Sequence, residues 1–95
     1  MDEFEWDEAK NAANLVKHGI SFEEAATIFE GPVLTDIDNG PYDEIREKSF
    51  GMIGGIVVAC VVHTDRNGRT RIISARKATK SERNHFNDYL KKAAH

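Results

Sequence analysis

The sequence predicts an α+β fold with two N-terminal helices, a four-stranded, mainly antiparallel sheet and a C-terminal helix. Three observations lead to this class. Residues 21–24 and 79–82 are capping boxes, each with Ser or Thr three residues before Glu, and they mark helix starts. Between them, the apolar residues change from a helical to a strand-like spacing. Asn67-Gly68 separates two apolar runs and is the strongest short signal for a hairpin turn.

The first helix is expected from Asp7, as its N-cap, to His18, with Gly19 ending it in the left-handed conformation. The second follows Ser21 and ends at Gly31-Pro32. Apolar residues available for packing are Ala9, Ala12, Ala13, Leu15 and Val16 in the first helix and Phe22, Ala25, Ala26 and Phe29 in the second. Strands are expected over 33–38, 45–52, 56–64 and 69–76. The last helix runs from 79 to about 90, with Phe86, Tyr89 and Leu90 facing inward.

Length and composition favour one small domain over residues 1–95. The sequence contains no apolar run long enough to span a bilayer, and its acidic N-terminus lacks the order of a signal peptide, so a cytoplasmic protein is expected. Cys60 lies in an apolar run and is expected to be an inert buried thiol. The four histidines show no ligand spacing, so we expect no metal and no cofactor.

Charge is divided sharply along the chain. Residues 1–44 hold twelve acidic side chains and two basic ones, whereas residues 45–95 hold eleven basic and four acidic ones. The halves carry −10 and +7, which sum to the net charge of −3. Such asymmetry indicates a nucleic-acid or charged-protein partner.

Hairpin turns of two residues would fix the register of the sheet. Pairing Arg66 with Arg69, and Ile53 with Ile56, places on one face Arg46, Lys48, His63, Ser74 and Arg76. The other face then collects Val58, Cys60, Val62, Ile73 and Ala75, together with Arg71. Part of the cationic face must also be covered, because it includes Phe50, Met52, Val57 and Ile72.

A cationic strand face suits chemistry on a phosphodiester. Arg and Lys orient phosphates, and a histidine moves protons near neutral pH. RNA cleavage by the 2′-OH needs a base, cations for the charge developing on phosphorus, and an acid for the leaving 5′-oxygen, without a required metal. The same face would also suit passive RNA binding.

Two segments carry a resemblance to a known family. The first is Phe4-x-Trp6-Asp7-x-x-Lys10-x-x-x-Asn14-x-x-Lys17-His18-Gly19-Ile20-Ser21-Phe22-Glu23-Glu24-Ala25. The second comprises Val62-His63-Thr64-x-Arg66, Arg71-Ile72-Ile73-Ser74-Ala75-Arg76-Lys77-Ala78 and Glu82-Arg83. Together they resemble the signatures of BrnT-type toxins over nearly the whole chain. The resemblance implies a RelE-like ribonuclease fold and the role of toxin in a type II toxin–antitoxin pair. It also implies a BrnA-type antitoxin with a ribbon–helix–helix domain, through which the complex would reach promoter DNA.

The combined hypothesis is a metal-independent endoribonuclease that inhibits translation and growth. Its expected catalytic residues are Arg76, His63 and Arg46, and its expected RNA-binding residues are Lys48, Ser74, Lys77 and Arg83. Glu82 is expected to be structural, as the capping partner of Thr79. The alternative is a non-catalytic module that binds RNA or an antitoxin; a direct DNA-binding regulator fits less well, because no helix carries a dense basic face. The acidic half either docks a basic antitoxin segment or packs against the basic strands.

Overall fold

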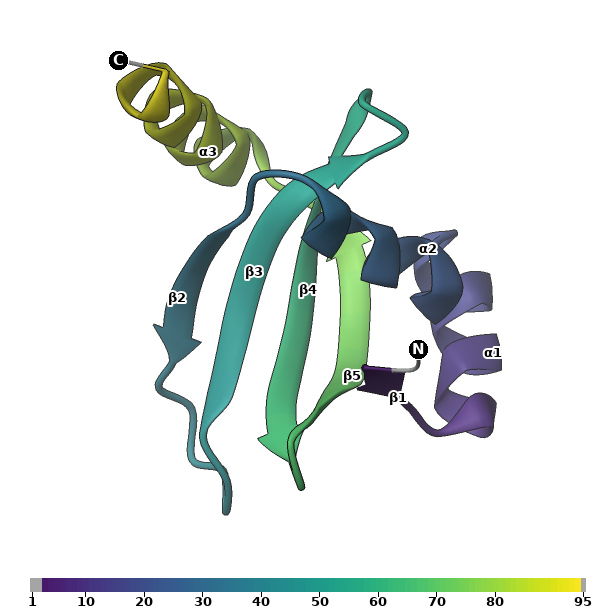
Figure 1. Ribbon diagram of the computed structural model, residues 1–95. Coiled ribbons are helices and arrows are strands. Elements are labelled where there is room, and N and C mark those ends of the chain that lie inside the picture. Colours follow the sequence, from purple (N-terminus) through teal and green to yellow (C-terminus); the bar gives the residue numbers. More distant parts are fainter. Residues whose placement is uncertain (1–2, 95) are drawn as a thin grey trace.

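The computed structural model describes residues 3–94 and confirms the α+β class (Figure 1). Its helices are α1 (Glu8–His18), α2 (Phe22–Ala26), the 3-10 helix η1 (Thr27–Glu30) and α3 (Lys80–Ala93). Its strands are β1 (Phe4–Glu5), β2 (Leu34–Asp38), β3 (Arg46–Ile53), β4 (Val57–Arg66) and β5 (Arg69–Lys77). Within residues 3–94, no helix has both the length and the apolar character that a membrane span needs.

The sheet contains a fifth strand in addition to the four predicted from the sequence. Strands β2 to β5 form the expected antiparallel meander, and the sheet order is β1-β5-β4-β3-β2. The added strand β1 runs parallel to β5, with Phe4 opposite Thr70 and Glu5 opposite Arg71. Two residues are too few to show an alternating pattern, so only the fold reveals this pairing.

The helix ends lie where their capping residues predict. The Asp7 side chain accepts a hydrogen bond from the Lys10 backbone N–H, and Gly19 has a left-handed φ of 74°. Both capping boxes are complete, at Ser21 and at Thr79. The second helix is shorter than expected, because α2 ends at Ala26 and η1 continues the segment with tighter turns.

Each face of the sheet packs against its own helices, as Figure 1 shows with α1 and α2 on one side and α3 on the other. The larger core lies under α1, α2 and η1 and includes Phe22, Ile28, Val61 and Ile72. The smaller core lies under α3 and comprises Phe50, Val58, Cys60, Ala78 and Phe86, with Tyr89 and Leu90 partly buried against it. The inward face predicted for the last helix is therefore confirmed.

Helix α1 presents the opposite face from the one predicted. Its buried residues are Asn11 and Asn14, whereas the alanines and Leu15 are exposed and Val16 keeps 89% of its surface accessible. Asn14 Nδ2 donates to the carbonyls of Ile20 and Ala75, and its Oδ1 accepts from the Ala75 N–H. The buried amide thus replaces a neighbouring strand at the edge of β5, which explains why a polar side chain occupies this position.

Candidate functional site

The observed register differs from the predicted one at the hairpin between β3 and β4. Ile53 pairs with Val57 instead of Ile56, because the loop has three residues, Gly54-Gly55-Ile56. Glu47 therefore lies opposite His63, and Lys48 lies opposite Val62. A shift of one residue exchanges the two faces of a strand, so Arg46 and Lys48 face α3 and His63 does not.

A β-bulge changes the pairing of β5 as well. The expected pairs Arg66–Arg69 and His63–Ile72 are confirmed, but the ladder is irregular between Val62 and His63. Beyond this point Ser74 lies opposite Val62, and Arg76 lies opposite Cys60. The bulge thus brings Ser74 and Arg76 to the face that Arg46 and Lys48 occupy.

We call this face the α3 face. It carries Arg46, Lys48, Arg71, Ser74 and Arg76, so four of the five residues predicted to share a cationic face do so, and Arg71 joins them. Val58, Cys60 and Val62, which were predicted for the other face, also lie here. Helix α3 covers the apolar half, where Phe86 packs near Phe50, and the side chains of the cationic half are partly accessible. Val57, Ile72 and Ala75 face α1 and α2 instead.

His63 does not join the cationic residues, so its predicted place beside Arg76 is wrong. The residue is 7% exposed, and its ring packs edge-on against Phe29, with the ring centroids 5.3 Å apart. His63 Nε2 lies 2.7 Å from Ser49 Oγ, and burial lowers the pKa of the imidazole. Ser49 is fully buried, so this Ser–His pair is a structural contact and offers no accessible nucleophile.

Arg76 is held by a carboxylate at the start of α3. Its two terminal nitrogens donate to the two Glu82 oxygens at 2.8 and 3.0 Å. Glu82 also accepts from the Thr79 N–H at 2.8 Å, which confirms its expected capping role. The hydrogen bonds from Arg76, above all, lower the pKa of Glu82 to about 2. An incoming phosphate would have to share or replace this carboxylate.

The other two predicted RNA-binding cations are placed differently from each other. Arg83 lies in the first turn of α3, is exposed, and donates to the Ala78 carbonyl at 3.3 Å. Lys77 is exposed but lies opposite Ala59, on the face that α1 and α2 cover. Only Arg83 therefore stays within reach of the α3 face.

Arg46 is fixed by the loop between β2 and β3. Its Nε donates to Glu44 at 2.6 Å, and its guanidinium carbon lies 3.9 Å from the centroid of the Tyr42 ring. The hydrogen bond to Glu44 raises the pKa of Arg46, so the guanidinium stays charged. This contact over the Tyr42 ring is a cation–π interaction that restricts the side chain at the open end of the sheet.

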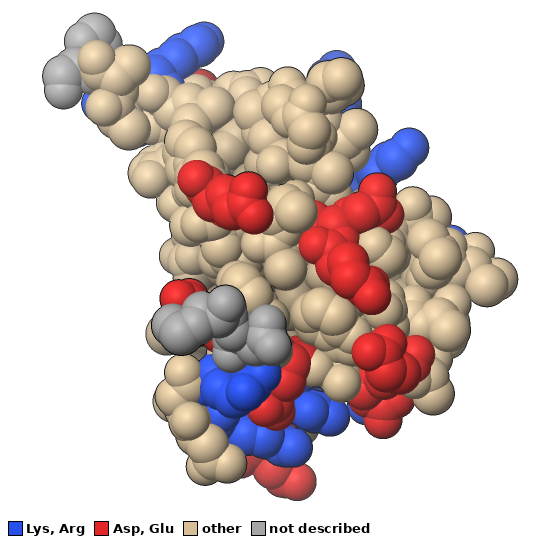
Figure 2. Space-filling model, turned by 45° about the vertical axis from the view of Figure 1, so that its right-hand side comes forward, with Lys and Arg blue, Asp and Glu red and all other residues tan. Residues whose placement is uncertain are grey.

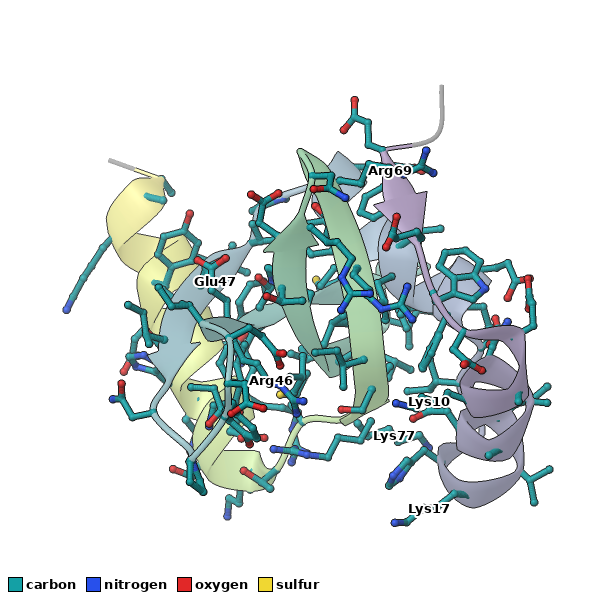
Figure 3. All side chains as sticks on the ribbon, turned by 90° about the horizontal axis from the view of Figure 1, so that it is seen from below. Lys10, Lys17, Arg46, Glu47, Arg69 and Lys77 are labelled. Atoms are coloured by element: carbon teal, nitrogen blue, oxygen red, sulfur yellow. The ribbon has the colours of Figure 1, made fainter. Side chains whose placement is uncertain are left out.

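A cavity of about 210 Å³ lies at this end, and most of its lining is cationic. Its lining consists of four cations and one carboxylate, together with Thr64 and Ile73. The cations are Lys10, Arg46, Arg66 and Arg71, and the carboxylate is Glu44. Figure 3 shows Lys10 leaving α1 on the same side of the sheet as Arg46. We refer to this hollow as the cationic cavity.

Three of the four cavity cations lie outside the cationic face predicted from the sequence. The predicted cationic face does not include Arg66, and Arg71 is predicted for the opposite face. For Lys10 the signal was its spacing, because Asn14 lies one helical turn later and its buried amide turns that side of α1 toward β5. The spacing of Lys10 and Asn14 indicates the direction of Lys10 only when the burial of Asn14 is known.

Among residues 3–94, no three His, Cys, Asp or Glu side chains are grouped so that they could hold a metal ion. Cys60 is buried under α3, and this burial raises the pKa of its thiol. The polar side chains that line the cavity are the four cations, the Glu44 carboxylate and the buried Thr64 hydroxyl. The last of these donates to the Ile45 carbonyl at 2.6 Å.

Comparison with known proteins agrees with the fold described above. A family model described as the ribonuclease toxin BrnT of type II toxin–antitoxin systems matches residues 6–82. The crystal structure of the Brucella abortus ribonuclease toxin BrnT, at 1.1 Å resolution, superposes with a TM-score of 0.65 and 23% identity. The match covers 84% of this chain and 100% of the Brucella chain, and at this identity it shows a shared fold. No curated protein matches the sequence. Because the family model spans most of the molecule, the chain belongs to the BrnT family of ribonuclease toxins of type II toxin–antitoxin systems.

Proposed function

We propose that this chain is a metal-independent endoribonuclease whose active site is the cationic cavity and the adjoining α3 face. The observation that carries the proposal is the cavity lining, in which Lys10, Arg46, Arg66 and Arg71 surround one carboxylate, Glu44. Several fixed cations around a hollow provide electrostatic stabilisation for a phosphate that gains negative charge in the transition state. The carboxylate supplies a proton acceptor in the same place.

In the proposed reaction the RNA supplies its own nucleophile. Glu44 accepts the proton of the 2′-OH, whose oxygen attacks the adjacent phosphorus, while Arg46 turns from Glu44 to the phosphate. Arg71 and Arg66 stabilise the additional charge. Lys10 donates a proton to the departing 5′-oxygen, so the products are a 2′,3′-cyclic phosphate and a 5′-OH end, and no oxidant or metal enters the balance.

The α3 face extends the site along the RNA strand. Lys48, Ser74 and Arg76 are proposed to contact a neighbouring phosphate, with Arg83 at the start of α3 as a further contact. Arg76 exchanges one of its hydrogen bonds to Glu82 for the phosphate. His63 and Lys77 have no role in this scheme, because both belong to the opposite face.

The direct test is incubation of the purified protein with RNA in EDTA. Cleavage should persist, the products should carry a cyclic phosphate, and Arg46→Ala and Glu44→Gln should each slow cleavage by about 100-fold. Lys17→Ala removes an exposed cation near the end of α1, so it serves as the matched control and should change little. Intact RNA, or cleavage unaffected by the cavity variants, would contradict the proposal. RNA that is bound but never cut would support the non-catalytic alternative, which the burial of His63 favours.

The biological part of the proposal follows from the family. We propose that cleavage inhibits translation and growth in the cytoplasm, and that the sheet is a RelE-like variant. The proposed partner is a BrnA-type antitoxin with a ribbon–helix–helix domain, which would bring the complex to promoter DNA. Growth arrest on expression, relieved by the product of a neighbouring gene with that pattern, tests both points. Arrest that Arg46→Ala and Glu44→Gln leave unchanged would contradict RNA cleavage as its cause.

A further inference from the structure

Two adjoining hollows lie beside β1, on the side of the molecule away from α3. Their volumes are about 460 and 350 Å³, and they share Phe4, Glu23 and Ala26 in their linings. We call the combined depression the β1 groove; it is lined by Phe4, Trp6, Ala26 and Phe29 and by Glu3, Glu8, Glu23 and Glu30, with Glu5 and Arg69 at one end. Figure 2 shows this side of the molecule, where separate groups of carboxylates surround uncharged surface and basic side chains lie at one end.

The walls of the β1 groove are aromatic. Phe4, Trp6 and Phe29 are each half-buried, so one part of each ring packs inward while the rest remains accessible. The Trp6 ring stands edge-on to Phe22 at 6.2 Å, and Phe4 lies 5.4 Å from Phe29. These contacts fix the rings, and fixed rings provide apolar and cation–π contacts at little entropic cost.

The carboxylates of the groove are available for a cationic partner. Within residues 3–94, Glu3, Glu8, Glu23 and Glu30 have no Lys or Arg at ion-pair distance, whereas Glu5 is paired with Arg69 and Arg71. Asn11 Nδ2 donates to Glu23 at 2.8 Å and to Glu8 at 3.3 Å, so one amide holds both side chains in place. The same bond lowers the pKa of Glu23, which keeps it charged. RNA is repelled by such a surface.

We propose that the β1 groove is a docking surface for a Lys- or Arg-rich segment of the antitoxin, with a cationic or aliphatic side chain against Trp6. The assignment rests on the proposed partner and is carried by charge complementarity over a hollow with aromatic walls. Position supports it as well, because the Glu5–Arg71 ion pair connects the groove to the cationic cavity. A segment that leaves the groove past Arg69 reaches the RNA side, where the rest of the antitoxin would obstruct the cavity.

Trp6 is the single tryptophan of the chain, so its fluorescence reports on the groove directly. The first probe is a synthetic peptide rich in lysine and leucine, added to the intact protein. Its binding should change Trp6 emission in a saturable way, and acetylation of the lysines should abolish the effect. The double variant Glu8→Gln, Glu23→Gln keeps the acceptors for Asn11 but removes two charges, and it should weaken binding by about tenfold.

The matched control is Asp43→Asn with Asp88→Asn, which removes the same charge from exposed positions outside the groove. Equal affinity of both double variants for the peptide would overturn the docking surface, as would equal binding of the acetylated peptide. The second probe is the protein encoded beside the toxin gene; an affinity for it that Glu8→Gln, Glu23→Gln leaves unchanged would overturn the antitoxin as occupant. RNA cleavage without either probe should be unaffected by this variant. A protein that binds the peptide but cuts no RNA would therefore contradict only the proposed activity.

Discussion

The Arg76–Glu82 pair shows, at the scale of single residues, how one carboxylate can serve two parts of the fold. Glu82 completes the capping box of α3 and also accepts two hydrogen bonds from Arg76. The capping contact stabilises the start of α3, and the contact with Arg76 fixes the position of a proposed phosphate ligand. Because Glu82 Oε1 takes part in both contacts, a change in the charge of Glu82 alters the helix end and the arginine together.

Acid titration should reveal this coupling. The pKa of Glu82 is about 2 in the folded chain, against an ordinary value of 4.5, so its contribution to stability is complete above pH 4.5 and is lost as the pH falls toward 2. In Glu82→Gln we expect a loss of about 1 kcal/mol at neutral pH, and a shallower decline in acid. Urea denaturation across this range measures both. Parallel curves for the two proteins would show that Glu82 is not the titrating group.

His63 should produce a separate pH dependence. Burial lowers its pKa below the ordinary value of 6.5, so the unfolded chain binds a proton more readily than the folded one. Stability should therefore fall as the pH drops below about 6.5, with a slope of at most about 1.4 kcal/mol per pH unit. His63→Gln should remove that slope in urea denaturation while RNA cleavage, measured on folded protein, continues. Loss of cleavage in a folded His63→Gln protein would return the histidine to the mechanism.

At the scale of secondary-structure elements, caps and turns were the predictable features. Ser21, Thr79, Gly19 and Asn67-Gly68 act locally, so a few neighbouring residues suffice to determine them. Register was not predictable to the residue. The loop after β3 includes Ile56, and a bulge interrupts the pairing of β5. Each of these features shifts the register by one residue, which exchanges the two faces of a strand. The types of residue at the site were therefore expected, but His63 was placed with the wrong neighbours.

Helix α1 shows a different limit of prediction from hydrophobic periodicity, because the inward face of this helix is polar. Hydrophobic periodicity assigns Ala and Val to the interior, and it cannot detect that the Asn14 amide meets the free backbone of β5. Asn14→Asp keeps the acceptor for the Ala75 N–H but places a carboxylate against two carbonyls. We expect it to destabilise the fold by about 2–3 kcal/mol, as judged by denaturant unfolding. Asn84→Asp, at an exposed position, is the control. A similar small effect at both positions would refute the role of Asn14 as the hydrogen-bond partner of the β5 edge.

At the scale of the whole molecule, the charge asymmetry of the sequence becomes a separation of surfaces. The basic half supplies most of the cationic cavity, with Lys10 added from α1, and the acidic half lines the β1 groove. Some acidic residues do pack against basic strands, as Glu5 does with Arg69 and Arg71. The packing alternative for the acidic half thus holds for Glu5, and docking of the antitoxin remains our proposal for the β1 groove.

Salt dependence of RNA binding tests this separation. Each phosphate contact made to single-stranded RNA adds about −0.7 to the slope of log affinity against log salt concentration. Arg71→Ala should reduce the magnitude of the slope by about 0.7, whereas Lys17→Ala should leave it unchanged. Filter binding of an uncleavable 2′-deoxy oligonucleotide over a range of salt gives these slopes. Equal slopes for the two variants would mean that the cavity does not contact the backbone.

The bulge in β5 has a consequence for how this sequence can be aligned with its relatives. Ser74 pairs with Val62 and Ile72 pairs with His63, so Ile73 has no partner on β4. A relative that lacks this residue can keep every other pair, with a continuous ladder and the same side chains on each face. The interval between Arg71 and Arg76 would then be shorter by one residue, although both would still face α3. A single-residue gap at this point in β5 is therefore compatible with an intact site, whereas a gap elsewhere in the strand would exchange its two faces.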